Sequence, residues 1–260
     1  MQNSFSFSRL WLLIKKQWFD NAKLYTLSLL AMAGLLTIIL TFWASVNGNG
    51  RFDEEDTYGI FITLFFTSGL IFASITFSAL SDKAKGIYWL SIPATPLEKL
   101  LCGFFYSFIV FTAVYVAIFF IIQKIIFFFI LLDPGNAVRY VSTKNLKEAI
   151  PIILYFFIAL QALFMLGSVY FERFAFIKTL LAIFTIGLIF VFFAQFLSNT
   201  VFPAHMGVND FSSFKVYDGN EAKVYKLPSW IRQVAVPAMK YIWCPVLLTA
   251  AYFRIKEKEI

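Results

Sequence analysis

Side chains that commonly carry catalysis or bind metal ions are few in this sequence. There is one histidine, His205, and there are two cysteines, Cys102 and Cys244, each within an apolar run. Metal sites need several such ligands at short spacings, and no such spacing occurs, nor any GxxxxGK[ST], HExxH or CxxC pattern. We therefore predict packing roles for both cysteines, a loop position for His205, and no catalytic residue, cofactor or metal on this chain, which we expect not to be an enzyme.

Three polar side chains interrupt long apolar runs. Gln161 and Gln195 are amides, which either bond neighbouring helices or line a substrate pathway. Lys240 stands between Pro237 and Pro245, and a charge within a span must reach the interface or face a polar cavity. We favour helix–helix contacts for the amides and the interface for the lysine, and both prolines should kink their helix.

The polar segment 81–99 contains an apolar cluster between charged residues and two prolines. Its members are Ile87, Tyr88, Trp89 and Leu90. An exposed cluster with a tryptophan is typical of a docking surface for a partner. Near the end of the segment, Thr95, Pro96 and Glu98 match the N-cap, N1 and N3 positions of a helix. This pattern predicts a helix that begins before the membrane and continues into the next span.

This segment is similar to the loop between the second and third spans in permease subunits of type-2 ATP-binding-cassette exporters. The matching sequence is KGIYWLSIPATPLEKL, residues 85–100, and the family's Leu-Pro-x-[Ser/Thr]-x-x-Glu pattern has Ile92 in place of leucine here. The resemblance implies a coupling helix that sits in a cleft of a separate ATPase subunit, which binds the ATP. It implies a set of ATPase-docking residues: Lys85, Tyr88, Trp89, Leu90, Pro93 and Glu98.

The composition predicts an all-α, polytopic integral membrane protein. Of 260 residues, 60% are hydrophobic and 14% are charged, and the mean hydropathy is +0.76. A soluble domain of this length could not cover so much apolar surface, whereas a lipid bilayer removes that requirement. The net charge of +7 is gathered in short clusters at the ends of apolar runs. That pattern indicates orientation in a membrane, and we predict no nucleic-acid partner.

A helix needs roughly 20 apolar residues to cross a bilayer, and such runs predict six spans. They are residues 24–46, 58–80, 100–124, 150–171, 177–197 and 234–253. Gln123 and Lys124 interrupt the third run, which then stays apolar to Leu132. We therefore expect the span to end near Lys124 and residues 125–132 to continue as a projecting or interfacial helix.

Residues 1–23 are predicted to form an N-terminal interfacial helix, and residues 24–260 the six-span transmembrane domain. Residues 5–22 place apolar side chains at three- and four-residue spacing on one helix face. These side chains are Phe7, Leu10, Trp11, Ile14 and Trp18, and the opposite face carries Arg9, Lys16, Asp20 and Lys23. The segment corresponds to the elbow helix of the permease family, although it could also be an ordinary flank of the first span.

The distribution of lysine and arginine predicts cytosolic termini. The predicted inner segments hold twelve of these residues and the two short outer loops hold four, and cytoplasmic loops carry the excess in membrane proteins. The coupling loop 81–99 is then cytosolic, and the segment 198–233 lies outside. Within it, residues 214–225 form two alternating runs around an Asp-Gly pair, which predicts a β-hairpin.

Our first functional hypothesis is a permease subunit of an ATP-driven exporter in a bacterial cytoplasmic (inner) membrane. It would work with an ATPase subunit and with a second copy of itself or a sister permease. One alternative is a non-transporting anchor or assembly component of an envelope complex. Another is an integral membrane enzyme that modifies lipids, which the scattered acidic residues disfavour. The sequence does not indicate the transported substrate.

Overall fold

Long helices account for most of the chain. The structure is a computed structural model that describes residues 5–46, 51–78, 83–140, 143–171, 173–201, 205–209, 213–218, 221–226 and 228–258. Its elements, in chain order, are α1 (Phe7–Val46), β1 (Arg51–Asp53), α2 (Glu54–Ile75), α3 (Lys83–Leu90), α4 (Pro96–Phe104), the π-helix η2 (Phe105–Val110), α5 (Phe111–Leu131), β2 (Ala137–Arg139), α6 (Thr143–Tyr170), α7 (Ala175–Val201), β3 (His205–Asn209), β4 (Ser213–Asp218), β5 (Glu221–Lys226), α8 (Ser229–Tyr241) and α9 (Trp243–Lys258).

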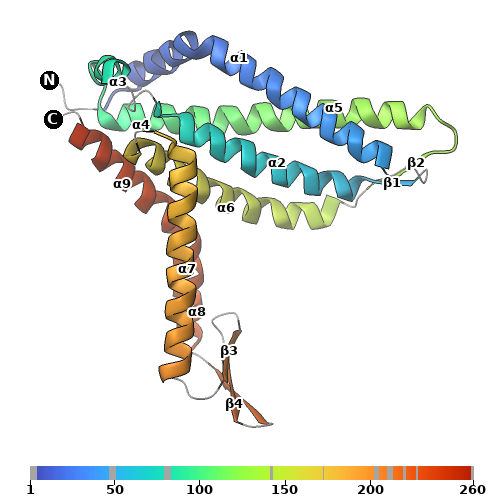
Figure 1. Cartoon of the computed structure of the whole chain (residues 1–260), viewed down its shortest axis with the longest axis vertical. Coiled ribbons are helices and arrows are strands. Elements are labelled where there is room, and N and C mark those ends of the chain that lie inside the picture. Colours follow the sequence, from blue (N-terminus) through green and yellow to red (C-terminus); the bar gives the residue numbers. More distant parts are fainter. Residues whose placement is uncertain are drawn as a thin grey trace.

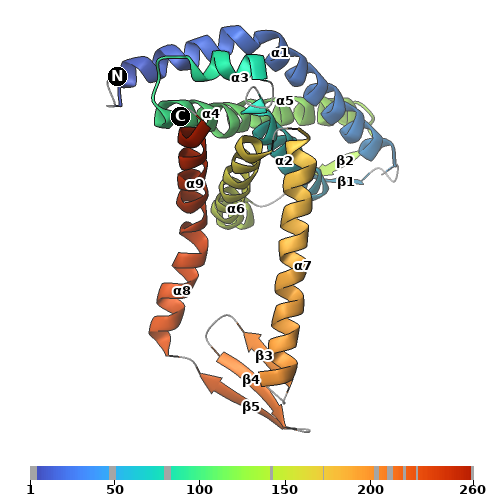
Figure 2. The same cartoon turned by 60° about the vertical axis from the view of Figure 1, so that its left-hand side comes forward.

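The first helix, α1, is continuous over 40 residues and curves over its neighbours (Figures 1 and 2). The predicted interfacial helix and the predicted first span are therefore parts of one helix, which does not end near residue 23. At ~1.5 Å per residue, α1 is roughly 60 Å long, about twice the ~30 Å of a hydrocarbon core. Only part of α1 can therefore lie within a bilayer. Its buried contacts are made by Leu13 in the first half and by Leu36 and Leu40 in the second.

A bundle is formed by α1, α2, α6 and the continuous helix α4–η2–α5, which lie side by side (Figures 1 and 2). Its centre is aromatic, and the Phe65 and Phe157 rings lie 4.0 Å apart between α2 and α6. Gly69 allows this approach, because a Cβ there would meet Phe157 Cζ at 2.6 Å. The buried members of this core are Leu36, Leu40, Phe65, Phe111, Tyr115, Phe119 and Phe157.

The third predicted span is a helical stretch of 36 residues, Pro96–Leu131. As expected, the helix continues past Gln123, and the buried Gln123 amide donates to Thr57 Oγ1 of α2 at 2.7 Å. The last turns of α5 are covered by Phe52, which packs with Phe127 and Ile130. Next to this cluster, β1 and β2 form a short parallel pair that sequence reasoning did not predict.

The helix α7 leaves the bundle crosswise, and α8 runs from the far end of this arm back toward the bundle (Figure 2). Near its start, α7 packs on α6, where Thr179 lies so close to Gly167 that a Cβ on the glycine would overlap the threonine side chain. Beyond that point, no α7 side chain from Leu180 to Leu197 is buried. These side chains must be covered by lipid or by another subunit.

The far end of the arm carries an antiparallel sheet in the order β3-β4-β5. Asp218 of β4 pairs with Glu221 of β5, so two residues connect these strands. The predicted β-hairpin is thereby confirmed. His205, predicted to lie in a loop, is instead the first residue of β3, and its side chain lies outside the described residues.

The sixth predicted span corresponds to two helices, α8 and α9, separated at Ile242. Pro245 explains the break, because its ring nitrogen has no hydrogen to donate to the Tyr241 carbonyl and its ring clashes with that carbonyl. Pro237 lies inside α8 without ending it. The second helix, α9, returns to the bundle and buries Ala251 and Ile255 against α6 residues that include Met165.

Within the described residues, five helical stretches are long and apolar enough to cross a membrane. They are Phe7–Val46, Glu54–Ile75, Pro96–Leu131, Ala149–Tyr170 and Ala175–Leu197. The chain is an all-α, multi-pass membrane protein, as its composition predicted.

Candidate functional site

The short helix α3 lies beside the first half of α1 at one end of the bundle, close to both termini (Figure 1). It spans eight residues, and the Ser91 amide continues its bonding by donating to the Ile87 carbonyl at 2.9 Å. Pro93 follows two residues later and favours extended backbone at Ile92, which prevents further helix. The predicted docking segment is thus a separate helix between α2 and α4.

The apolar cluster of α3 has two kinds of members. Ile87 is 71% exposed and Tyr88 is 59% exposed. Trp89, in contrast, is half-buried, and its ring meets the Phe77 ring edge-on at 5.7 Å. The side chains of Lys85 and Leu90 lie outside the described part of the chain. Ile87 and Tyr88 therefore form the accessible surface, while Trp89 attaches α3 to the bundle.

The start of α4 has the predicted capping box. The Glu98 amide donates to the Thr95 hydroxyl at 3.3 Å, and the Thr95 amide donates to Glu98 Oε2 at 2.8 Å. Pro96 occupies the first helical turn, where its missing N–H costs nothing. This part of the prediction is confirmed, and it fixes where the long third stretch begins.

Glu98 also binds the beginning of α1. Its Oε1 accepts from the Ser6 amide at 2.7 Å and from Arg9 Nη2 at 3.0 Å. Glu98 is completely buried, whereas the Arg9 side chain is 29% exposed. A carboxylate buried in this way needs such charged and backbone donors to offset its lost hydration.

The neighbouring Lys99 is almost fully buried, and its ammonium group lies 5.1 Å from the centroid of the Trp89 ring. Cation–π contacts of this kind are strengthened where water is excluded. On the other side of α3, Lys16 donates to the Tyr88 hydroxyl at 2.5 Å. α3 is therefore held between α1 and α4 by contacts from both of its aromatic side chains.

The predicted polar residues of the spans have different surroundings. The buried Gln161 amide donates to the Gly69 carbonyl of α2 at 3.1 Å, which is the predicted contact between helices. Gln195 is exposed on α7, and the side chain of Lys240 in α8 lies outside the described residues. The structure thus places these three residues on the three helices α6, α7 and α8.

Sequence reasoning did not identify Arg9, Lys16 or Gln123 as bonding residues. Arg9 and Lys16 looked like the polar face of a surface helix, and Gln123 looked like the end of a span. A polar side chain within an apolar run was an available signal for Gln123, but its partner Thr57 is an ordinary residue of α2. The partners in these contacts are 66 to 89 residues apart.

Over the described residues, no group of three or more His, Cys, Asp and Glu side chains could hold a metal ion. Cys102 is buried and Cys244 is half-buried, and both are free thiols. Comparison of the chain with protein-family models, with curated proteins and with solved structures gives no match.

Proposed function

We propose that this chain is the membrane-spanning permease subunit of an ATP-driven transporter, with a separate ATPase docked on α3. The observation that carries the proposal is the arrangement of α3. An isolated, short helix presents Ile87 and Tyr88 outward, and it is fastened through Tyr88 and Trp89 to two long helices. A plain connector between spans needs neither the exposed apolar surface nor the fastening.

The contacts of α3 support a mechanical role. A push on α3 would act on α1 through the Lys16–Tyr88 bond and on α4 through the contact between Lys99 and Trp89. The Arg9–Glu98 pair and the bond from the Ser6 amide to Glu98 join the beginning of α1 to α4 at the same end. Movement of the ATPase on nucleotide binding would then displace both long helices together, which is the displacement that changes access to a pathway.

The position of the termini supports the proposed orientation. Both termini and α3 lie at one end of the bundle, and β1 and β2 lie at the other (Figure 1). The excess of lysine and arginine in the termini and coupling loop favours a cytosolic location for their end, where ATP is available. The uncovered surface of α7 is available to lipid and to a second permease copy or a sister permease.

Site-specific photocrosslinking tests this proposal. A photoreactive phenylalanine analogue replaces Ile87 in the full chain, which is expressed in its native host so that the host's own ATP-binding-cassette ATPase subunits are present. The matched control carries the analogue at Asp53, at the opposite end of the bundle. We expect an ATPase adduct from position 87 and none from position 53, together with ATPase activity that depends on the chain. Equal crosslinking at both positions, or none at either, would reject α3 as the docking site.

A further inference from the structure

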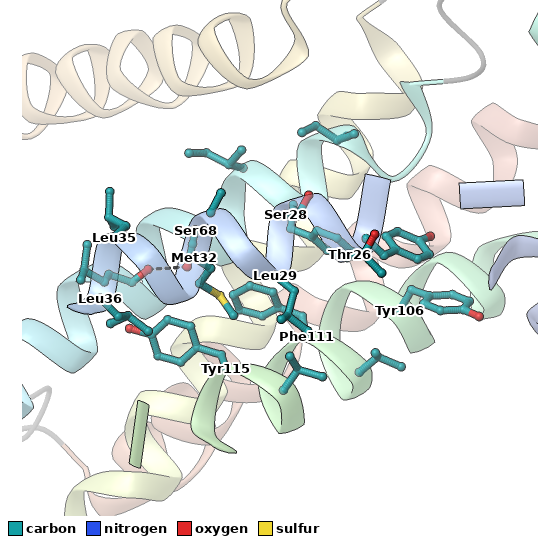
Figure 3. Close-up of a pocket in the computed structure, with 18 of the residues that line it drawn as sticks. Thr26, Ser28, Leu29, Met32, Leu35, Leu36, Ser68, Tyr106, Phe111 and Tyr115 are labelled. Carbon is teal, nitrogen blue, oxygen red and sulfur yellow. Dashed lines mark hydrogen bonds between the residues drawn. The ribbon is translucent and has the colours of Figure 1, made fainter. Parts of the chain in front are cut away.

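A cavity of about 390 Å³ lies between α1, α2 and the η2–α5 helix (Figure 3). Its size is within the roughly 300–1,000 Å³ usual for ligand sites. Aliphatic and aromatic side chains form most of its wall: Leu29, Met32, Leu35, Leu36, Phe111 and Tyr115.

The hydroxyl groups in this wall are already bonded within the protein. Thr26 and Ser28 donate to the Ala22 and Leu24 carbonyls, and Ser68 donates to the Leu64 carbonyl at 2.5 Å. The buried phenols are also bonded, because the Tyr106 hydroxyl donates to the Ile14 carbonyl and the Tyr115 hydroxyl donates to the Phe61 carbonyl. The cavity therefore offers a ligand shape and apolar contact, which suits a hydrocarbon chain.

A second cavity, of about 440 Å³, adjoins the first and has more polar groups in its wall. Its wall includes Lys16, Gln17, Asp20 and Asn21 of α1. Four residues line both cavities: Tyr25, Phe72, Ile75 and Tyr106. The two cavities are thus successive compartments along α1, the polar one toward α3 and the apolar one toward the bundle centre.

The dimensions of the apolar compartment match one leaflet of a bilayer. Apart from Trp18, whose ring lies 5.8 Å from that of Tyr25, the α1 residues of its wall run from Tyr25 to Leu36. At ~1.5 Å per residue this stretch is roughly 16 Å long, about half of a ~30 Å hydrocarbon core. The polar compartment then lies at the depth where lipid headgroups meet water.

We propose that the two compartments hold one zwitterionic phospholipid of the leaflet on the α3 side. One acyl chain occupies the apolar cavity, and the headgroup occupies the polar cavity. Lys16 Nζ and Asp20 Oδ2 are 3.1 Å apart and partly exposed, so they present one positive and one negative charge to the ligand. A phosphate pairs with Lys16 and an ammonium group pairs with Asp20, which is the charge pattern of a zwitterionic headgroup.

A headgroup in the polar cavity would also affect how firmly α3 is held. Tyr88 and Trp89 also line the polar cavity, so a bound headgroup contacts the same side chains that fasten α3. The lipid would stabilise α3 against α1.

Photolabelling with a phosphatidylethanolamine tests the proposal, using a diazirine in the middle of one acyl chain and the full chain reconstituted in nanodiscs. Adducts are mapped by mass spectrometry of peptides. Met32 and Val114 line the cavity and are half-buried, so a lipid bound in it can reach them, whereas Ile38 is 70% exposed and lies outside the cavity. We expect saturable adducts on Met32 and Val114, beside non-saturable adducts on the outward Ile38.

Two variants on α2 sharpen the test. Ser68→Phe fills the cavity, whereas Thr67→Phe places the same ring on the exposed neighbouring residue. Labelling of Met32 should fall about tenfold in the first variant, equivalent to ~1.4 kcal/mol, and stay unchanged in the second. Adducts confined to Ile38 and similar surface residues in the unmodified chain would overturn the proposal even if Ser68→Phe does not fold.

Competition distinguishes the headgroup. Unlabelled phosphatidylethanolamine should displace the probe several-fold better than phosphatidylglycerol, which has no ammonium group to pair with Asp20. Equal displacement by both lipids would overturn the assignment of the polar cavity.

Discussion

The Arg9 guanidinium lies 3.0 Å from the Glu98 carboxylate, although 89 residues separate them in the sequence. The contact joins the beginning of α1 to the beginning of α4. Glu98 also accepts from the Ser6 and Thr95 amides, so one carboxylate holds the first turns of both helices. Only five residues connect α3 to α4. A displacement of α3 would therefore be transmitted to the bundle at this junction.

Replacing Glu98 by Ala should destabilise the protein strongly. The change leaves the Arg9 charge without its carboxylate and removes the capping box, and breaking a buried ion pair costs about 3–5 kcal/mol. The matched control is Glu257→Ala, which removes the exposed Arg254–Glu257 pair on α9. Thermal unfolding in detergent should show a lower midpoint for Glu98→Ala and almost none of that change for the control. Equal midpoints would mean that the junction contributes little to stability.

Glu98→Gln should separate docking from transport in the assembled complex. The amide keeps the shape of the side chain but weakens its bond to Arg9, so the coupling between α3 and the two long helices should loosen. Under the proposed function, ATPase association stays close to that of the unmodified protein, while hydrolysis no longer depends on transport. A pull-down and an ATPase assay in nanodiscs measure the two effects. Lost association with intact coupling would contradict this division of roles.

Ile87 and Trp89 should behave differently when each is replaced by Ala. Ile87 points away from the bundle, so its removal should weaken ATPase binding without loosening α3. Central interface residues contribute ~2 kcal/mol or more, which corresponds to roughly thirtyfold in affinity. Trp89→Ala removes the contacts with Phe77 and Lys99, so it should increase hydrogen exchange across α3. Unchanged exchange in Trp89→Ala would show that the ring does not fasten this helix.

Local patterns allowed the most accurate predictions. The capping box at Thr95 and Glu98 and the hairpin between β4 and β5 each depend on residues a few positions apart. Backbone preferences and short-range bonds determine such features, so the sequence contains the information directly. The long apolar helices were predictable for a related reason, since a bilayer requires roughly 20 apolar residues in succession.

Contacts between distant helices could not be predicted in this way. The pairing of Gln123 with Thr57 depends on how α5 packs against α2, and neither residue specifies its partner. The same holds for Trp89, which the sequence indicated as an exposed anchor. It turns inward because the apolar surface around Phe77 and the Lys99 ammonium group are within reach. Its neighbours Ile87 and Tyr88 now fit the docking role better.

Gly69→Ala should disturb the contact between α2 and α6. The added methyl group would lie 2.6 Å from Phe157 Cζ and 3.0 Å from Gln161 Nε2, so the aromatic core must shift. Overpacking of this kind costs about 1–3 kcal/mol. Gly34→Ala on α1 is the matched control, because nothing lies within 4 Å of its added Cβ, and alanine there should stabilise the helix slightly. The unfolding midpoints of both variants in detergent should therefore move in opposite directions, and a fall of the same size in both would contradict the close packing.

The orientation of the chain in the membrane should follow its charge distribution. Single cysteines are placed at Asp53 and Arg139, which lie on the exposed β1–β2 pair, and at Ile87 and Lys256, which lie toward the other end. The background lacks Cys102 and Cys244. In intact cells, a membrane-impermeant maleimide should label positions 53 and 139, because that end is predicted to face outward.

Positions 87 and 256 should react only after the membrane is permeabilised. The reason is the excess of lysine and arginine in the predicted inner segments, since cytoplasmic loops retain these residues. Permeabilised cells serve as the control that each cysteine is reactive. Positions 53 and 139 lie at one end of the bundle, and positions 87 and 256 lie toward the other. If the bundle crosses the membrane, a reagent outside the cell can therefore reach only one of these two pairs. Labelling of position 87 from outside would reverse the orientation and would leave an ATPase no access to α3.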